Sequence, residues 1–68
     1  MVRSAKEFIA AKGDQAVADA TGREIAAVRV WKSRNRFPRA AWLELAQAFP
    51  ELDLETLRRL DTEATVRT

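Results

Sequence analysis

The residues best suited to bind another molecule are six basic side chains between positions 23 and 39. They are Arg23, Arg29, Lys32, Arg34, Arg36 and Arg39, and Glu24 is the one acidic residue among them, which gives this segment a net charge of +5. Residues 1–22 contain three basic and three acidic groups, whereas residues 40–68 contain three basic and six acidic groups. A basic segment of this density is typical of a surface that binds a polyanion such as nucleic acid. The alternative interpretation is a charged surface that contacts only solvent.

Catalytic chemistry has few candidate residues in this chain. There is no Cys, no His and no Tyr, and only two Ser. Thiol and imidazole catalysis, disulfides and zinc sites therefore lack their side chains. Ten carboxylates remain, but a chain with two glycines has little material for a loop that cradles phosphate. The sequence predicts a protein that is not an enzyme and that holds no cofactor and no metal.

Size and composition predict one small intracellular domain. The chain has 68 residues, of which 47% are hydrophobic and 32% charged. A domain of this size buries only about 60% of the surface of its unfolded chain, which leaves room for a single core. Charged residues interrupt every apolar run too often for a membrane span. Charge returns at Lys12, before an apolar stretch reaches the length of a signal peptide, so we expect a cytoplasmic protein.

Helix signals recur along the chain, whereas no run alternates between apolar and polar residues over the length of a strand. Ser4 and Glu7 match a capping box for a first helix, and Gly13 ends that helix. Asp14 can cap a second helix, and Pro38 is well placed as the first residue of a fourth. The expected helices cover about residues 5–12, 15–21, 24–33, 38–49 and 54–60.

Apolar residues at helical spacing indicate which face of each helix is buried. In the second helix Val17 and Ala20 are expected to point inward. The buried face of the third helix comprises Ile25, Val28, Trp31 and Lys32, that of the fourth comprises Trp42, Leu45, Ala46 and Phe49, and a fifth helix capped by Asp53 repeats Leu54, Leu57 and Leu60. No periodic face continues after Asp61. We therefore expect an all-α bundle of four to five short helices in one domain, residues 1–60, followed by a frayed tail, residues 61–68.

The segment 15–34 has the pattern of a helix-turn-helix, in which two short helices meet at a tight turn and the second helix is basic. Ala18 is small, as it must be where the second helix crosses close to the first. Gly22 can adopt the positive φ that the turn requires. Val28 and Trp31 can hold the second helix against the core.

These residues resemble the helix-turn-helix of phage Cro and cI repressors, and more closely the small Cro-like proteins of the YdaS type found in bacterial genomes and prophages. The resemblance covers about residues 8–60 and includes GDQAVADATG, the pair Val28 and Trp31, and WKSRNRFPRAAWLEL. It implies a lambda-repressor-like fold and double-stranded DNA as the partner. Thr21 and Arg23 depart from the family pattern, because such proteins usually place aliphatic residues there to seal the turn.

By this resemblance, the start and outer face of the third helix read base edges in the major groove. The corresponding residues are Ile25, Ala26, Arg29 and Val30. Arg29 is the main candidate, because a guanidinium can donate two hydrogen bonds to O6 and N7 of guanine. The alternatives are a phosphate contact for Arg29 and a core position for Ile25.

Other polar residues near the turn and after the third helix are expected to contact phosphates, which position a protein without reading sequence. They are Gln15, Arg23, Lys32, Arg34, Arg36 and Arg39. Arg39 follows the expected start of a helix at Pro38, where its charge opposes the helix dipole, and this favours an anionic partner. Trp31 and Trp42 are interpreted as core residues and not as stacking platforms for bases.

The sequence as a whole predicts a DNA-binding transcriptional regulator of bacterial or phage type, associated with the nucleoid. It would bind as a homodimer on DNA or beside a partner protein, with Leu43 and the leucines of the fifth helix as candidate contacts, and it would not bind membrane. Two alternatives are a nonspecific nucleoid binder and a helical adaptor that uses the acidic C-terminal third.

Overall fold

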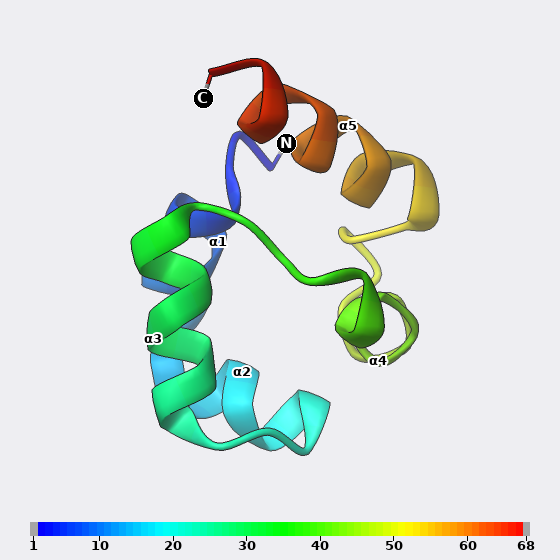
Figure 1. Ribbon diagram of the computed structural model, residues 1–68. Coiled ribbons are helices and arrows are strands. Elements are labelled where there is room, and N and C mark those ends of the chain that lie inside the picture. Colours follow the sequence, from blue (N-terminus) through cyan, green and yellow to red (C-terminus); the bar gives the residue numbers. More distant parts are fainter. Residues whose placement is uncertain (1, 68) are drawn as a thin grey trace.

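The computed structural model describes the backbone of residues 2–67 and the side chains of residues 2–63. Its elements are α1 (Ala5–Lys12), α2 (Asp14–Thr21), α3 (Ile25–Arg34), the 3-10 helix η1 (Arg39–Ala41), α4 (Trp42–Ala48) and α5 (Leu54–Arg67). Figure 1 shows α3 along one side of the molecule, close to α1 and α2, with α4 and α5 across from it. The described residues include no strand, so the predicted all-α class is confirmed.

The two ends of α1 form as the sequence predicts. The Ser4 hydroxyl oxygen accepts a hydrogen bond from the Glu7 amide at 3.1 Å, which satisfies one of the free amides of the first turn. Gly13 follows the helix with a φ of 95°, a backbone conformation that favours glycine. The Lys12 ammonium lies over the rings of Phe8 and Phe49, at 5.7 and 5.8 Å from their centroids, so its aliphatic stem covers the edge of the core.

Helix α2 begins one residue earlier than the sequence predicts. Gly13 is its N-terminal cap residue, and Asp14 is helical and makes no side-chain capping bond. The capping prediction for Asp14 is therefore wrong. The prediction for Ala20 is also wrong, because Ala20 is exposed and Thr21 is buried in its place. The Thr21 hydroxyl donates a hydrogen bond to the Val17 carbonyl at 2.8 Å, which lets a polar side chain enter the core.

The turn after α2 and the C-terminal end of α3 each contain one residue in the left-handed conformation. Gly22 has a φ of 68°, and Asn35, just after the helix, has a φ of 55°. The Asn35 side-chain oxygen accepts a hydrogen bond from the Lys6 amide at 2.8 Å, which ties the end of α3 to the first turn of α1. Val28 and Trp31 are buried, as predicted, and fix the rotation of α3 about its axis. The helix is displaced by one residue from the expected range of 24–33.

The segment between α3 and α4 differs from the prediction at Pro38. This residue has extended backbone angles and precedes η1, so it is not the first residue of a helix that runs to Pro50. Phe37 is buried before it, with its ring edge-to-face against Trp31 at 6.3 Å. Trp42 is only half-buried, and its indole N–H donates to the Phe37 carbonyl at 3.3 Å. Burial of Phe37 therefore decides the path of this loop.

Helix α5 continues beyond the predicted domain boundary. Asp53 caps it as expected, because a carboxylate oxygen accepts from the Thr56 amide at 2.9 Å. The helix then runs to Arg67, whereas a frayed tail was expected from residue 61. The Thr62 hydroxyl donates to the Arg58 carbonyl at 3.0 Å, and Asp61 pairs with Arg36. The backbone of residues 61–67 is therefore helical, and Asp61 and Thr62 make polar contacts in its first part.

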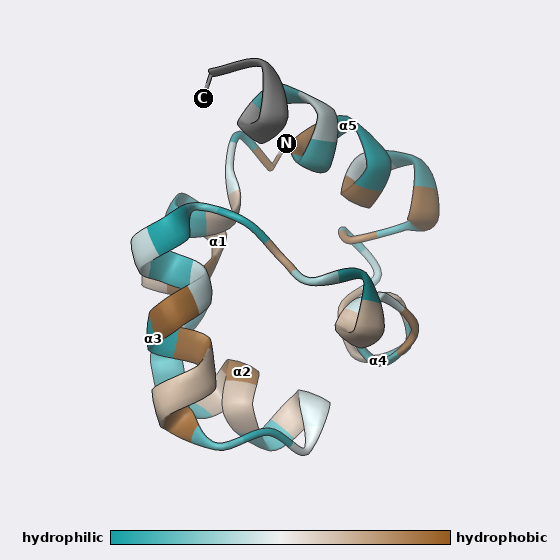
Figure 2. Ribbon diagram, in the orientation of Figure 1, coloured by the Kyte–Doolittle hydropathy of each residue, from teal (hydrophilic) through white to brown (hydrophobic). Residues whose placement is uncertain are grey.

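One apolar cluster connects all five α-helices. Figure 2 shows apolar and polar residues interspersed along the helices, and the buried apolar residues are Ala5, Phe8, Ile9, Val17, Ala18, Val28, Trp31, Phe37, Ala41, Leu45, Leu52, Leu57 and Leu60. Leu43 of α4 and Leu54 of α5 are exposed. Because Leu57 and Leu60 are buried, the leucine row of α5 is divided between core and solvent. Within the described residues no helix combines the length and apolarity needed to cross a membrane.

Two leucines of α4 allow a matched test of this core. Leu45 is fully buried, whereas Leu43, two residues away, is 69% exposed. We expect Leu45→Ala to lower the free energy of unfolding by about 2–5 kcal/mol, because it leaves a cavity among fixed neighbours. Leu43→Ala should change it by no more than about 0.5 kcal/mol. Urea unfolding measures both values, and equal losses would contradict this assignment of the core.

Candidate nucleic-acid interface

The exposed face of α3 carries three of the four residues predicted to read bases. Ala26, Arg29 and Val30 are exposed, and Arg29 keeps 65% of its side chain accessible. Ile25 is half-buried and packs against the core. This position agrees with the alternative interpretation of Ile25, which is core packing and not a base contact. The outer face of α3 is therefore formed of two small apolar side chains with a long cationic one between them.

Residues from α3 and from the segment after it meet around one shallow depression of about 290 Å³. Its lining comprises Val30, Trp31, Arg34, Arg36, Pro38 and Arg39. The buried rings of Trp31 and Phe37 hold the two sides of this depression together. Three arginines that the sequence predicts as phosphate contacts are thus gathered beside the outer face of α3.

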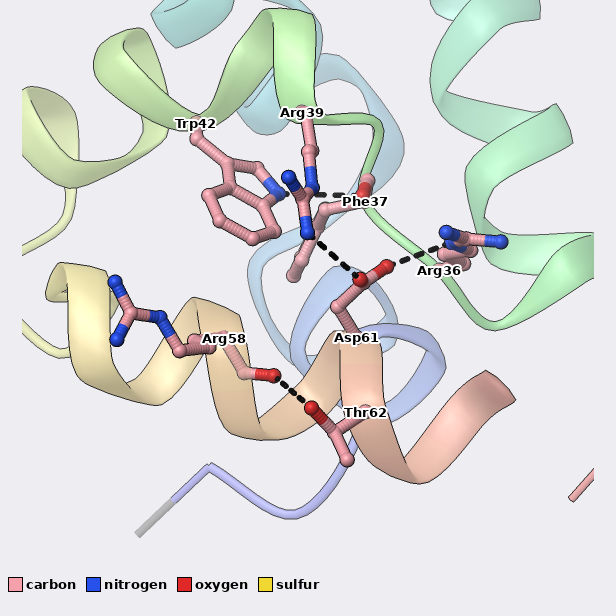
Figure 3. Close-up of polar contacts among 7 residues, drawn as sticks. All are labelled: Arg36, Phe37, Arg39, Trp42, Arg58, Asp61 and Thr62. Atoms are coloured by element: carbon pink, nitrogen blue, oxygen red, sulfur yellow. Dashed lines mark hydrogen bonds and ion pairs between the residues drawn. The ribbon is translucent and has the colours of Figure 1, made fainter. Parts of the chain in front are cut away.

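Arg36 and Arg39 are held by one carboxylate from α5, as Figure 3 shows. Arg36 Nε lies 2.7 Å from one oxygen of Asp61, and an Arg39 terminal nitrogen lies 4.0 Å from the other. The Arg39 guanidinium also stacks over the Trp42 ring, 5.3 Å from its centroid. The Asp61 side chain is only 13% exposed, whereas those of Arg36 and Arg39 are 51% and 77% exposed. The two cations are therefore anchored from the inside and remain open to solvent.

Sequence reasoning missed Asp61, because it assigned this residue to a tail. A signal was nevertheless present. Asp61 follows Leu57 by four residues and so continues the buried face of the last helix. A carboxylate on an apolar face needs a cationic partner, and the basic segment is the available source.

A second carboxylate, Asp14, pairs with two cations of α3. Lys32 Nζ lies 2.8 Å from Asp14 Oδ1, and Arg29 Nε lies 3.4 Å from Oδ2. The hydrogen bond from Lys32 is the main cause of a lowered pKa for Asp14, with smaller contributions from the charge of Lys32 and from Arg29. The Lys32 side chain is half-buried, and its ammonium group pairs with Asp14 within the protein.

Arg23 and Gln15 lie outside the depression that the three arginines line. Arg23 reaches across the turn, where a terminal nitrogen donates to the Ala40 carbonyl at 3.1 Å and lies 3.7 Å from Glu44 Oε1. It therefore connects the turn to η1 and to the first turn of α4. Gln15 is exposed in the first turn of α2, and its amide group donates to Asp19 at 2.8 Å.

Comparison of the chain with protein-family models, with curated proteins and with solved structures finds no match. The resemblance to Cro-like proteins therefore stays a prediction. Among the residues whose side chains the structure describes, no three acidic groups come together in a way that could hold a metal ion. The arrangement is instead a surface of cations, in which Arg29 and Lys32 pair with Asp14, and Arg36 and Arg39 pair with Asp61.

The ion pairs of Asp14 make the free energy of unfolding depend on pH in the acid range. Because the pKa of Asp14 in the folded protein is below the ordinary 3.8, its ion pairs stabilise the fold above that pH and are lost as the pH falls through the folded value. The pKa values of Glu51 and Asp53 are lowered too, by hydrogen bonds from Lys12 and Thr56. We expect the unfolding free energy to fall between about pH 5 and pH 2.

Asp14→Asn tests the contribution of this one carboxylate. The variant should lose stability less steeply over the same acid range, because the group that takes up the proton is absent. A residual slope should remain from Glu51 and Asp53. Urea unfolding at a series of pH values measures both proteins, and parallel curves would show that Asp14 contributes nothing to the acid response.

Proposed function

We propose that this protein binds double-stranded DNA with α3 in the major groove, as a sequence-specific transcriptional regulator of bacterial or phage type. The observation that carries the proposal is the gathering of Arg34, Arg36 and Arg39 around one depression beside Val30 on the exposed face of α3. A row of cations next to a helix with small outward side chains is the arrangement that a groove flanked by phosphates requires.

The dimensions of α3 suit this role. Its ten residues form a rod about 15 Å long, and the major groove is about 12 Å wide, enough to admit one helix. Ala26 and Val30 allow close approach to base edges and can contact thymine methyl groups. Arg29, between them, is the one residue of this face that can donate two hydrogen bonds to a guanine.

Phosphate contacts would come from both ends of the helix-turn-helix. Arg34, Arg36 and Arg39 would meet the backbone beside the C-terminal half of α3. Gln15, in the first turn of α2, lies where free backbone amides favour a phosphate. Arg23 and Lys32 contribute positive charge while they keep their contacts with Glu44 and Asp14.

A module of this size makes a limited contact with DNA. A single small module buries about 600–1,000 Å² of protein surface, so useful specificity favours two copies on half-sites about 34–36 Å apart. Leu43 and Leu54 are exposed on α4 and α5, and they are the candidate contacts for a second copy or a partner protein. We also propose that the protein is located in the cytoplasm, on the nucleoid.

The first experiment is selection from a random duplex pool. The purified protein is incubated with the pool at about 0.15 M salt, the retained DNA is sequenced, and the stoichiometry of the complex is recorded. A shared motif supports the proposal, and its symmetry gives the number of subunits. Retention without a motif would identify a nonspecific nucleoid binder. No retention would favour a helical adaptor that uses the acidic third and the exposed leucines.

Arg34→Ala tests the phosphate contacts. It should weaken binding to all duplexes alike and reduce the slope of log K against log salt by about 1, because one cation no longer displaces a counterion. Arg58→Ala is the matched control, since Arg58 is exposed on α5 and points away from Asp61 in Figure 3. Filter binding or fluorescence anisotropy over a salt series measures both variants. The same slope in both would remove Arg34 from the phosphate-binding set.

Arg29→Ala tests the base contact. The variant should lose discrimination worth about 1–3 kcal/mol at one base position and keep the preferences elsewhere. Competition binding with singly substituted duplexes measures each position. Uniform weakening, without a change in preference, would make Arg29 a phosphate contact.

A further inference from the structure

Arg29 is held at its inner nitrogen. The atom that faces Asp14 Oδ2, at 3.4 Å, is Nε, and 65% of the arginine side chain remains exposed. The contact therefore restrains the guanidinium at the end nearest the helix. The two terminal nitrogens, which form the outer end of the fork, are not the atoms used in this contact.

Asp14 is itself fixed. Its side chain is only 19% exposed, in the first turn of α2, where the helix dipole favours a negative charge. Its other oxygen accepts a hydrogen bond from Lys32 Nζ at 2.8 Å. The carboxylate is thus oriented by the packing of α2 on α3 and by Lys32, and it presents its remaining oxygen to Arg29.

This arrangement favours base reading over phosphate binding. An unrestrained arginine is long and flexible, so it loses much rotamer freedom when it binds, and its bare charge is attracted to the nearest phosphate. A carboxylate at Nε removes part of that freedom in advance and offsets part of the charge. It also leaves the outer edge of the fork with the spacing that matches O6 and N7 of guanine.

We propose that Asp14 is a positioning residue for sequence reading, which holds Arg29 by Nε so that its terminal nitrogens face a guanine in the major groove. The inference rests on the proposed function and deepens it, because it names the base and the residue that sets the preference. Asp14 does not touch DNA in this proposal. Its effect passes through Arg29 and is confined to one base position.

The test compares Asp14→Asn with Glu24→Gln. Each variant removes one negative charge near α3, and the Glu24 side chain makes no capping bond. The probes are the best duplex from the random pool and its versions with each single base pair replaced. We expect Asp14→Asn to lose about tenfold of the discrimination at the guanine. Glu24→Gln should bind all duplexes slightly more tightly, because it removes repulsion from the phosphates, and Asp14→Asn should do so on the duplexes that lack the guanine.

Two further variants separate positioning from a merely structural effect. In an Arg29→Lys background, which keeps the charge but lacks the fork, Asp14→Asn should cause no additional loss of discrimination. Asp14→Glu keeps a carboxylate within reach of Lys32 and Arg29, and it replaces Asp14→Asn in the test if that variant does not fold. It should move the guanidinium and reduce the guanine preference in part. Circular dichroism and thermal unfolding verify the fold of each variant.

Each result decides the inference. Loss of the guanine preference in Asp14→Asn alone supports it. An unchanged preference would overturn it, as would equal weakening on every duplex, which would show that Asp14 acts through Lys32 on phosphate contacts. A wild-type protein that selects no motif would refute the proposed function itself, whereas a wild-type motif without a guanine opposite Arg29 would refute only this inference.

Discussion

The structure depends on carboxylates that lie beneath a crowded set of cations. Six basic side chains within 17 residues would repel one another on so small a domain. Asp14 from α2, Glu44 from α4 and Asp61 from α5 approach this segment from three directions. Their partners are Arg23, Arg29, Lys32, Arg36 and Arg39. Because the carboxylates are less exposed than most of their partners, they neutralise the segment from within and leave positive charge on the outside.

The sequence predicts the helices well where local rules decide. The Ser4 and Asp53 caps and the buried pair Val28 and Trp31 follow from neighbouring residues alone, and each is confirmed. Local rules fail where distant residues compete. Asp14 could cap α2, but cations of α3 bind its carboxylate instead. Burial of Phe37 against the core leaves Pro38 extended, which no capping rule anticipates.

For the candidate site, the sequence identifies the cations but not what holds them. Charge density along the chain is sufficient to find Arg34, Arg36 and Arg39, and helical spacing places Arg29 on the outer face. Asp14 is 15 residues from Arg29 in the chain, and Asp61 is 25 residues from Arg36. Pairings over such separations depend on how the helices pack, which local patterns do not determine.

The contact between Arg59 and Val2 has a consequence for the order of folding. An Arg59 terminal nitrogen donates to the Val2 carbonyl at 2.6 Å and joins residues 57 positions apart. Closing so long a loop costs more chain entropy than the contacts among α1, α2 and α3, which are near one another in sequence. We therefore expect the three N-terminal helices to assemble first and α5 to dock last. In the native state α5 should also open more readily than α3, and hydrogen exchange would report it as the less protected helix.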